Sequence, residues 1–378
     1  PKKLWSSGNI KNYEKCAKIM SSILFPLLTS FLSAAILTAI GLPLIIKACR
    51  YFNFFDLPNA RKMHSKPVPR LGGLIFMPSA VIGLFVASWT QVLMGGEEFV
   101  FGVSTVAMTF GGLMIYFIGV IDDRYGMKAS HKFVIQIFAA LFLPLCNLMI
   151  SDLNGLFGIH QIPIWAGYIL TVVLILVIVN AINLIDDIDG LSSGLCILIL
   201  TAYAVLLSAN CAIASLDAAI VGSLIVFWFF NVFGKVGGMK IFMGDAGSLF
   251  LGYVCAYMSI KSLMRPIAPV DCGEEQMMIS ITLLLIPVLD VVRVALQRKL
   301  TGHGIFEPDK THIHHILMNA GLSMHMTLAC ILALFFMICG INYALWQCHF
   351  SMPLVVVLDV AIYVLIWGVL MLVGKPDD

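Results

Sequence analysis

Charged residues are scarce in this chain of 378 residues: Asp, Glu, Lys and Arg make up 12% of it, and hydrophobic residues 60%. The mean hydropathy is +0.97. Soluble domains carry about 25% charged residues, so this composition excludes a chain of soluble domains. The formal net charge of +2 and the lack of a long basic run argue against a nucleic-acid partner. The sequence therefore predicts a membrane protein with several spans.

Paired cysteines and internal repeats are also lacking in the sequence, and no cleavable signal is expected. Its ten cysteines form no Cys-x-x-Cys pair, and several, such as Cys196 and Cys255, fall inside apolar stretches. They are expected to act as small apolar side chains, forming neither a zinc set nor a disulfide frame. The first apolar segment, 21–46, is too long for the core of a signal peptide. We expect a single membrane domain over 1–378, with a basic tail at 1–20.

Apolar windows of about 20 residues predict an all-α, polytopic fold with about eleven transmembrane helices. The windows are 21–46, 72–94, 99–121, 133–151, 164–183, 192–208, 212–233, 249–264, 277–296, 325–346 and 353–373. If these helices alternate, sixteen of the 23 Lys and Arg lie on one face or in the adjoining helix ends, although five lysines of the N-terminal tail do not. The positive-inside rule makes that face cytoplasmic, and we expect the active site there.

The densest polar stretch follows the window 164–183 and reads Asn-Ala-Ile-Asn-Leu-Ile-Asp-Asp-Ile-Asp-Gly-Leu over residues 180–191. Three aspartates at the bilayer centre would cost roughly 7 to 10 kcal/mol, so they belong at a membrane face, in a polar cavity or on a cation. The residues Asn180, Asn183, Asp186 and Asp189 recur every third position and would form one polar stripe if the helix continues. Such a stripe suits a hard cation and a phosphate-bearing substrate; an ordinary acidic loop is the alternative.

Two other loops carry carboxylates. Asp122 and Asp123 are adjacent at the end of the window 99–121. Neighbouring residues on a helix point about 100° apart, so one aspartate can meet a metal or substrate while the other holds a cation. Asp245 stands among small residues at a predicted helix start, which leaves room for a phosphate and a metal, and Phe242 is expected to stack on a base. A simple helix N-cap is the alternative for Asp245.

The loop 56–73 combines rigid prolines with basic side chains, of which Arg61, Lys62, His64 and Arg70 are candidates for binding substrate. It ends in Gly72-Gly73 at a helix entrance, which is expected to let a phosphate approach the backbone N–H groups. A positive-inside anchor is the alternative interpretation of this loop.

The loop 307–315 concentrates histidines, at His312, His314 and His315, after Lys310. Zinc is the less favoured interpretation, because no thiolate joins the histidines and the carboxylates elsewhere favour a hard ion. Hydrogen bonding to a phosphate or a sugar is preferred. Together the loops offer aspartates for Mg²⁺ and cations for phosphates, which is what joining two anionic phosphates requires.

In combination these motifs resemble the polyprenyl-phosphate N-acetylhexosamine-1-phosphate transferases, most of all the bacterial undecaprenyl-phosphate N-acetylglucosamine-1-phosphate branch. The motifs are Asn180-x-x-Asn183-x-x-Asp186-x-x-Asp189-Gly190, Phe242-Met-Gly-Asp245-Ala-Gly-Ser and His312-Ile-His314-His315. The resemblance implies transfer of a sugar-1-phosphate from a UDP-sugar to undecaprenyl or another polyprenyl phosphate, with release of UMP and with Mg²⁺ or Mn²⁺. It also implies a multi-pass protein of the bacterial cytoplasmic membrane that initiates cell-surface glycan synthesis, and it allows a homodimer.

The resemblance also implies roles for individual residues. Asp245 is expected to ligate the metal with Asp122. The aspartates expected to be catalytic are Asp122, Asp123, Asp186 and Asp189, the first two acting on the lipid phosphate. Asn183 is expected in the phosphate pocket, with Asn231 and Phe242 near the uridine. The side chains expected to bind substrate through charge or hydrogen bonds are Arg61, Lys62, His64, Arg70, Lys310, His312, His314 and His315.

Three positions depart from the family pattern. Asp187 stands where the family often has glycine, Gly126 where some members have a lysine that Lys128 can replace, and Lys310 where the N-acetylglucosamine branch often has arginine. A muramoyl-pentapeptide donor therefore stays open. The sequence also leaves open, independently of these departures, a two-step route through a phospho-aspartate. A membrane transporter is the alternative class, and it would gain if Asp217 and Asp290 lined a continuous pore.

Overall fold

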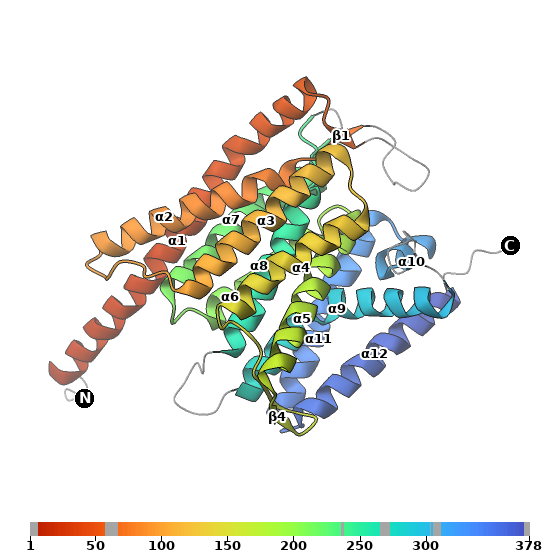
Figure 1. Ribbon diagram of the computed structural model, residues 1–378. Coiled ribbons are helices and arrows are strands. Elements are labelled where there is room, and N and C mark those ends of the chain that lie inside the picture. Colours follow the sequence, from red (N-terminus) through yellow and green to blue (C-terminus); the bar gives the residue numbers. More distant parts are fainter. Residues whose placement is uncertain are drawn as a thin grey trace, which may run out of the picture.

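The computed structural model describes residues 7–56, 67–235, 238–264, 273–302, 304 and 311–373, with side chains from 23 to 370 (Figure 1). Within these ranges the helices are α1 Ser7–Tyr51, α2 Phe76–Leu93, α3 Val103–Tyr125, α4 Ala129–Leu145, α5 Ile164–Leu184, α6 Leu191–Leu206, α7 Cys211–Phe233, α8 Asp245–Leu263, α9 Gly273–Leu300, α10 Ile313–Asn319, α11 Met324–Gln347 and α12 Met352–Val373. Two short 3₁₀ helices, η1 Gly72–Ile75 and η2 Ile185–Asp187, precede α2 and follow α5.

Two small antiparallel hairpins interrupt the helices. β1 Phe55–Asp56 pairs with β2 Val68–Pro69, and β3 Asp152–Leu156 pairs with β4 Ile159–Gln161. In Figure 1, β1 lies at one end of the bundle and β4 at the other. The windows had not predicted these strands, which are too short to show a period of two.

The all-α, polytopic fold is confirmed. Eight helices of the described chain are long and apolar enough to cross a membrane. Each of the other three predicted windows also falls on a helix. α4 and α6 are apolar but shorter, and α8 is not among the eight. The number of membrane crossings therefore stays a prediction.

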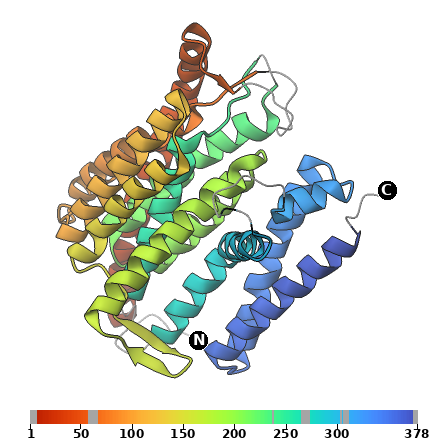
Figure 2. The same ribbon diagram turned by 45° about the vertical axis from the view of Figure 1, so that its right-hand side comes forward.

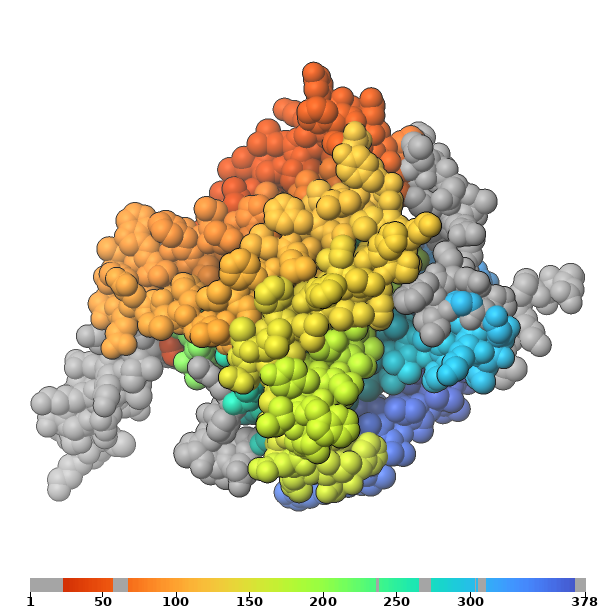
Figure 3. Space-filling model, viewed as in Figure 1, coloured from red at the N-terminus to blue at the C-terminus, as the bar shows by residue number. Residues whose placement is uncertain are grey.

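The core is built around α8. Sixteen of its 19 residues are buried, and it packs against α3, α5, α6 and α9. From the side seen in Figure 3, α3 and α4 form the surface over this core. A helix that is buried on all sides does not need lipid-facing side chains, so α8 tolerates serines along its length. By contrast, α12 exposes large apolar side chains such as Leu365, as expected of a helix that faces lipid.

The long helix α9 changes direction near its middle, as Figures 1 and 2 show. Pro287 lies inside it. A proline removes one backbone hydrogen bond and clashes with the preceding turn, which accounts for the bend. The half of α9 that follows the bend runs beside α10 and carries Asp290 and Arg293.

Candidate active site

Asp245 is the first residue of α8, and side chains from two other helices meet it. Its Oδ2 accepts a hydrogen bond from Lys132 Nζ at 2.7 Å, and its Oδ1 accepts one from Asn183 Nδ2 at 2.9 Å. Gly244, with φ of 76°, takes the N-cap position, a backbone conformation that favours glycine. The N-cap alternative for Asp245 is therefore wrong: its carboxylate points to Lys132 and Asn183.

Lys132 also binds Asp122, at 3.1 Å from Oδ2, so one ammonium group joins two carboxylates. The sequence had pointed to Lys128 as the cation after the aspartate pair, but Lys128 is exposed. Lys132 was missed because it lies in the next helix. The sequence pattern that could have indicated Lys132 is its position four residues, or about one helical turn, after Lys128.

Asp123 turns to the other side and holds Arg70. Its Oδ1 accepts from Arg70 Nη2 at 2.7 Å and Nε at 3.2 Å, and its two oxygens also accept from the backbone N–H groups of Asp245 at 3.0 Å and Ala246 at 3.1 Å. Asp123 therefore caps α8 from a different helix. The expectation that one of the paired aspartates holds a cation is confirmed. Burial disfavours the Arg70 charge, but Asp123 and the other carboxylates nearby outweigh it and raise the pKa of Arg70.

The glycine pair before α2 does not offer free N–H groups. Gly72 donates to the carbonyl of Phe242 at 2.9 Å, and Gly73 donates to that of Met243 at 2.8 Å. The expected approach of a phosphate to these groups is therefore wrong, because the loop before α8 already occupies them.

Glycine is required here by close packing instead. A Cβ on Gly73 would lie 2.2 Å from the Cα of Gly247, and one on Gly119 would lie 2.4 Å from the Cα of Ala246. Both distances are far inside van der Waals contact. The first turn of α8, which carries Asp245, is thus held between two backbones.

The polar stripe predicted over residues 180–189 is broken. α5 ends at Leu184, η2 follows, and Ile188 is extended. Asn183 stays beside Asp245, and Asp186 lies where the Asp245 charge acts on it. No described residue donates a hydrogen bond to Asp186, which leaves its oxygens available.

Asp189 lies in a buried cluster on the far side of this turn. It forms an ion pair with Lys240, and its Oδ1 accepts from Asn231 Nδ2 at 3.3 Å. The Asn231 side chain also accepts from Gly190 N at 2.7 Å and donates to Ile241 O at 3.0 Å. These contacts join the loop after η2 to the loop before α8. The predicted roles of Asp189 and Asn231 toward substrate stay predictions, as does base stacking on Phe242.

His312 is anchored by Asp290 from α9. Its Nδ1 lies 2.7 Å from Asp290 Oδ2, and the other carboxylate oxygen accepts from Arg293, Tyr363 and the backbone of Ile313 at 2.8–3.1 Å. Asp290 is thus saturated by partners that fix the start of α10, which removes one of the two reasons for a transporter. The other, Asp217, is buried without a hydrogen-bond partner in the described chain.

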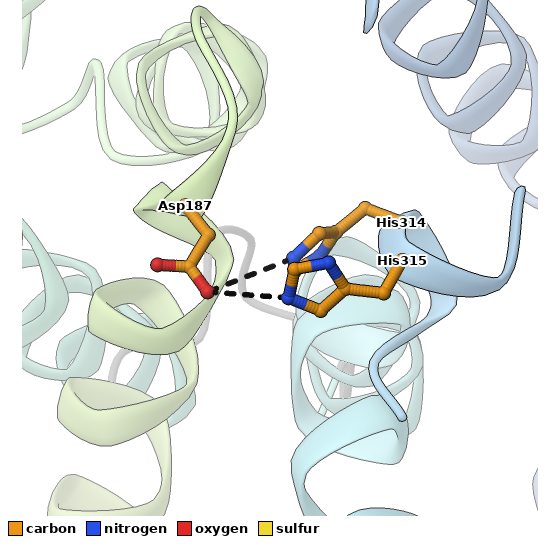
Figure 4. A group of neighbouring side chains, drawn as sticks. All are labelled: Asp187, His314 and His315. Atoms are coloured by element: carbon orange, nitrogen blue, oxygen red, sulfur yellow. Dashed lines mark ion pairs between the residues drawn. The ribbon is translucent and has the colours of Figure 1, made fainter. Parts of the chain in front are cut away.

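His314 and His315 face Asp187 across the same space (Figure 4). Asp187 Oδ2 lies 3.5 Å from His315 Nε2 and 3.9 Å from His314 Nε2. Burial lowers the pKa of His314, and the attraction of Asp187 only partly opposes this, so the ring is neutral at pH 7. The sequence had noted Asp187 as an extra carboxylate but had not placed it beside the histidines.

The described structure therefore brings most of the predicted residues to one region. Four of them, Arg61, Lys62, His64 and Lys310, lie outside the described residues. The residues that the sequence missed are Lys132, Arg293 and, as a partner of the histidines, Asp187. The arrangement combines oxygen ligands around one ammonium with an imidazole cluster beside it, which suits the binding of a cation and a polyphosphate.

Comparison with known proteins gives consistent results. The sequence profile of glycosyl transferase family 4 matches residues 105–263. A Bacillus subtilis (strain 168) protein named "Probable undecaprenyl-phosphate N-acetylglucosaminyl 1-phosphate transferase" is 34% identical over 82% of this chain and 80% of its own length. The decaprenyl-phosphate N-acetylglucosaminephosphotransferase of Mycobacterium leprae (strain TN) is 31% identical over 77% of each.

An Escherichia coli O157:H7 protein, the undecaprenyl-phosphate alpha-N-acetylglucosaminyl 1-phosphate transferase, is 27% identical over 78% of this chain and 77% of its own. The names of these relatives agree with the resemblance seen in the motifs. This multi-pass membrane protein therefore belongs to the polyprenyl-phosphate N-acetylhexosamine-1-phosphate transferase family.

Proposed function

We propose that this protein transfers N-acetylglucosamine-1-phosphate from UDP-N-acetylglucosamine to undecaprenyl or another polyprenyl phosphate and releases UMP. The observation that carries this proposal is the Asp245 centre, which we define as Asp122, Asp186, Asp245, Asn183 and Lys132. It gathers three carboxylates, from the end of α3, from η2 and from the start of α8, and one cation from the first turn of α4. The names of the relatives support the same donor and acceptor.

The Asp245 centre fits a magnesium ion. Asp122 and Asp245 already share one cation, the Lys132 ammonium, and Asp186 adds oxygens that no described residue occupies. Oxygen ligands from one or two carboxylates, completed by substrate phosphates and water, are what Mg²⁺ takes in phosphate-transfer sites. Asp245 and Asp122 would hold the ion, with Mn²⁺ as a substitute. When bound, it supplies charge neutralisation for the diphosphate of the donor.

The reaction joins two anions, so the protein has to position them and offset their charge. The acceptor phosphate is already anionic near pH 7 and needs little general base. Lys132 lies where an ammonium can move from the carboxylates to an incoming phosphate, and Arg70 stays charged because Asp123 favours its protonated form. Attack on the β-phosphorus of the donor then expels UMP, and the protein gains its rate from alignment and electrostatics.

The donor preference is proposed to depend on the imidazole cluster of α10. His312 is held by Asp290, and its ring stacks on His314 with centroids 5.7 Å apart and planes within 6°. His312, held by Asp290 and by this stack, can present a hydrogen bond to a compact sugar or to a diphosphate. A muramoyl-pentapeptide donor is the second candidate within the family.

We propose that the Asp245 centre faces the cytoplasm and that eleven helices cross the membrane. Support comes from the alternation of the predicted windows, which assigns sixteen of the 23 Lys and Arg to this face, and from Figure 1, where β1 lies at the opposite end from β4. Cysteine labelling from outside, in a background without native cysteines, should modify Glu97→Cys but not Lys128→Cys. The reverse pattern would contradict the placement of the Asp245 centre on the cytoplasmic face of the bacterial cytoplasmic membrane.

The test of the reaction uses purified protein with polyprenyl phosphate, Mg²⁺ and a panel of UDP-sugars. We expect UMP and a lipid diphosphosugar from UDP-N-acetylglucosamine. Release of UDP in place of UMP would contradict phosphosugar transfer. If UDP-muramoyl-pentapeptide is the only donor that is turned over, the proposed N-acetylglucosamine donor is wrong and the muramoyl-pentapeptide donor is correct.

A further inference from the structure

Asp187, His314 and His315, which we call the histidine triad, converge from two elements that are far apart in the sequence. Asp187 ends η2, and the histidines lie in α10. One ligand atom from each of the three residues lies within 4.8 Å of the other two. Figure 4 shows both imidazoles directed at the same carboxylate oxygen. Two ligands of a tetrahedral zinc ion are about 3.3 Å apart, and the His315 to Asp187 separation of 3.5 Å is close to this.

A second observation concerns His314. Its side chain is fully buried, yet neither ring nitrogen has a hydrogen-bond partner among the described residues. At 3.9 Å, the contact from its Nε2 to Asp187 is too long for a hydrogen bond. Buried imidazole nitrogens are normally paired, so this one points to a missing ligand. The ring is also held in place by its stack on His312, which Asp290 anchors.

The donor atoms decide which ion fits. Two imidazole nitrogens and one carboxylate suit zinc and its neighbours among the divalent transition metals, whereas magnesium prefers oxygen ligands only. Three protein ligands leave one position open, as in catalytic zinc sites. Asp187 is 62% exposed, so the open position can be reached from solvent.

We propose that the histidine triad binds Zn²⁺ or a similar divalent transition metal, at a site separate from the Asp245 centre. The two adjacent carboxylates of η2 then serve different ions. Asp186 lies where the Asp245 charge acts on it and the donors are oxygens, and Asp187 faces the imidazoles. The sequence had disfavoured zinc because no thiolate joins the histidines and the carboxylates elsewhere favour a hard ion, whereas the fold supplies a carboxylate ligand from η2.

The experiment uses the full chain, purified in detergent and stripped of metal, with Co²⁺ as the spectroscopic probe and no UDP-sugar present. We expect one equivalent of Co²⁺ with the visible bands of nitrogen and oxygen ligands. Zn²⁺ should displace it, whereas excess Mg²⁺ should not. Asp187→Asn and His315→Gln should each weaken binding at least tenfold, while His325→Gln, at an exposed histidine of α11, should bind like the parent.

Absence of Co²⁺ and Zn²⁺ binding in the parent protein would overturn the proposal. So would a thiolate charge-transfer band, or unchanged binding in Asp187→Asn, since either result would place the ion elsewhere. Asp187→Asn is the principal variant because its side chain is exposed and its loss should leave folding intact. The measurement needs no catalysis, so the two proposals can fail separately. Metal binding can be absent in an active transferase, and it can be present in a protein that lacks the proposed activity.

Discussion

The Asp245 centre and the histidine triad are built from adjacent aspartates, yet they have opposite chemistry. In the first, two carboxylates, of Asp122 and Asp245, share the Lys132 ammonium group, and a third, of Asp186, lies where the Asp245 charge acts on it. In the second, one carboxylate faces two imidazoles, of which His314 is neutral at pH 7. Both aspartates lie in η2. Asp186 belongs to the Asp245 centre, and Asp187 belongs to the histidine triad. The comparison teaches that in this family member the local turn, more than the residue type, assigns each carboxylate to its ligand.

The largest expected effect is on the Asp245 centre. Asp245→Asn keeps the shape of the side chain but removes the charge that holds the cation. We expect UMP formation to fall by roughly a thousandfold or more, because charge neutralisation is lost where two phosphates meet. Thermal unfolding in detergent should change little, and Glu97→Gln, at an exposed loop, is the matched control. Near-normal turnover by Asp245→Asn would refute its role at the metal.

We expect Asp290 to stabilise the position of His312 and the start of α10. Asp290→Asn breaks a buried ion pair with Arg293 and weakens the anchor of His312, so we expect a loss of about 3–5 kcal/mol in stability. The measurement is thermal unfolding. Asp217→Asn is the control, since this buried aspartate has no hydrogen-bond partner in the described chain and its neutral replacement should not destabilise. Equal destabilisation by both variants would contradict the anchor.

Lys132 tests whether the ammonium of the Asp245 centre and a metal compete. In Lys132→Met the two carboxylates lose their shared cation, so a metal should bind more tightly. We expect turnover to fall by about a hundredfold through lost charge stabilisation, with half-saturation at lower Mg²⁺. Lys128→Met, four residues earlier and exposed, should behave as the parent. An unchanged Mg²⁺ requirement would argue that Lys132 and the ion occupy different places.

The smallest expected effect is the pH dependence of the histidine triad. Because the pKa of His314 is lowered in the folded protein from its ordinary 6.5, the unfolded chain binds more protons between the two pKa values. Stability from this residue is present above pH 6.5 and declines as the pH falls below it. The unfolding temperature of the parent should therefore drop between pH 7 and 5.5. His314→Gln should show a smaller drop, and an equal drop would assign the effect to other groups.

Much of this architecture could be predicted from the chain alone. Long apolar windows predicted helices at each position where α1 to α9, α11 and α12 occur, because membrane spans require continuous apolar residues. The grouping of Asp122, Asn183 and Asp245 followed from motifs at helix ends. Residue roles toward substrate and metal stay predictions.

Contacts between distant segments could not be predicted. Lys132 enters the Asp245 centre because α4 folds back on α3, and no local pattern encodes that return. The approach of Asp187 to the α10 histidines is likewise a contact between distant segments, and Asp290 of α9 holds the start of α10. The use of the Gly72 and Gly73 N–H groups by the loop before α8 is also a long-range pairing.

The backbone contacts of the first turn of α8 have a consequence for mutational tolerance. Gly73 and Gly119 touch Gly247 and Ala246 so closely that a single methyl group would move the helix start. In a saturation library selected for growth, Gly73→Ala and Gly119→Ala should be depleted as strongly as losses of charged site residues. Gly102→Ala and Gly340→Ala, which have open space around the added atom, should persist. Close backbone packing thus limits substitution at glycines that contribute no side chain to the Asp245 centre.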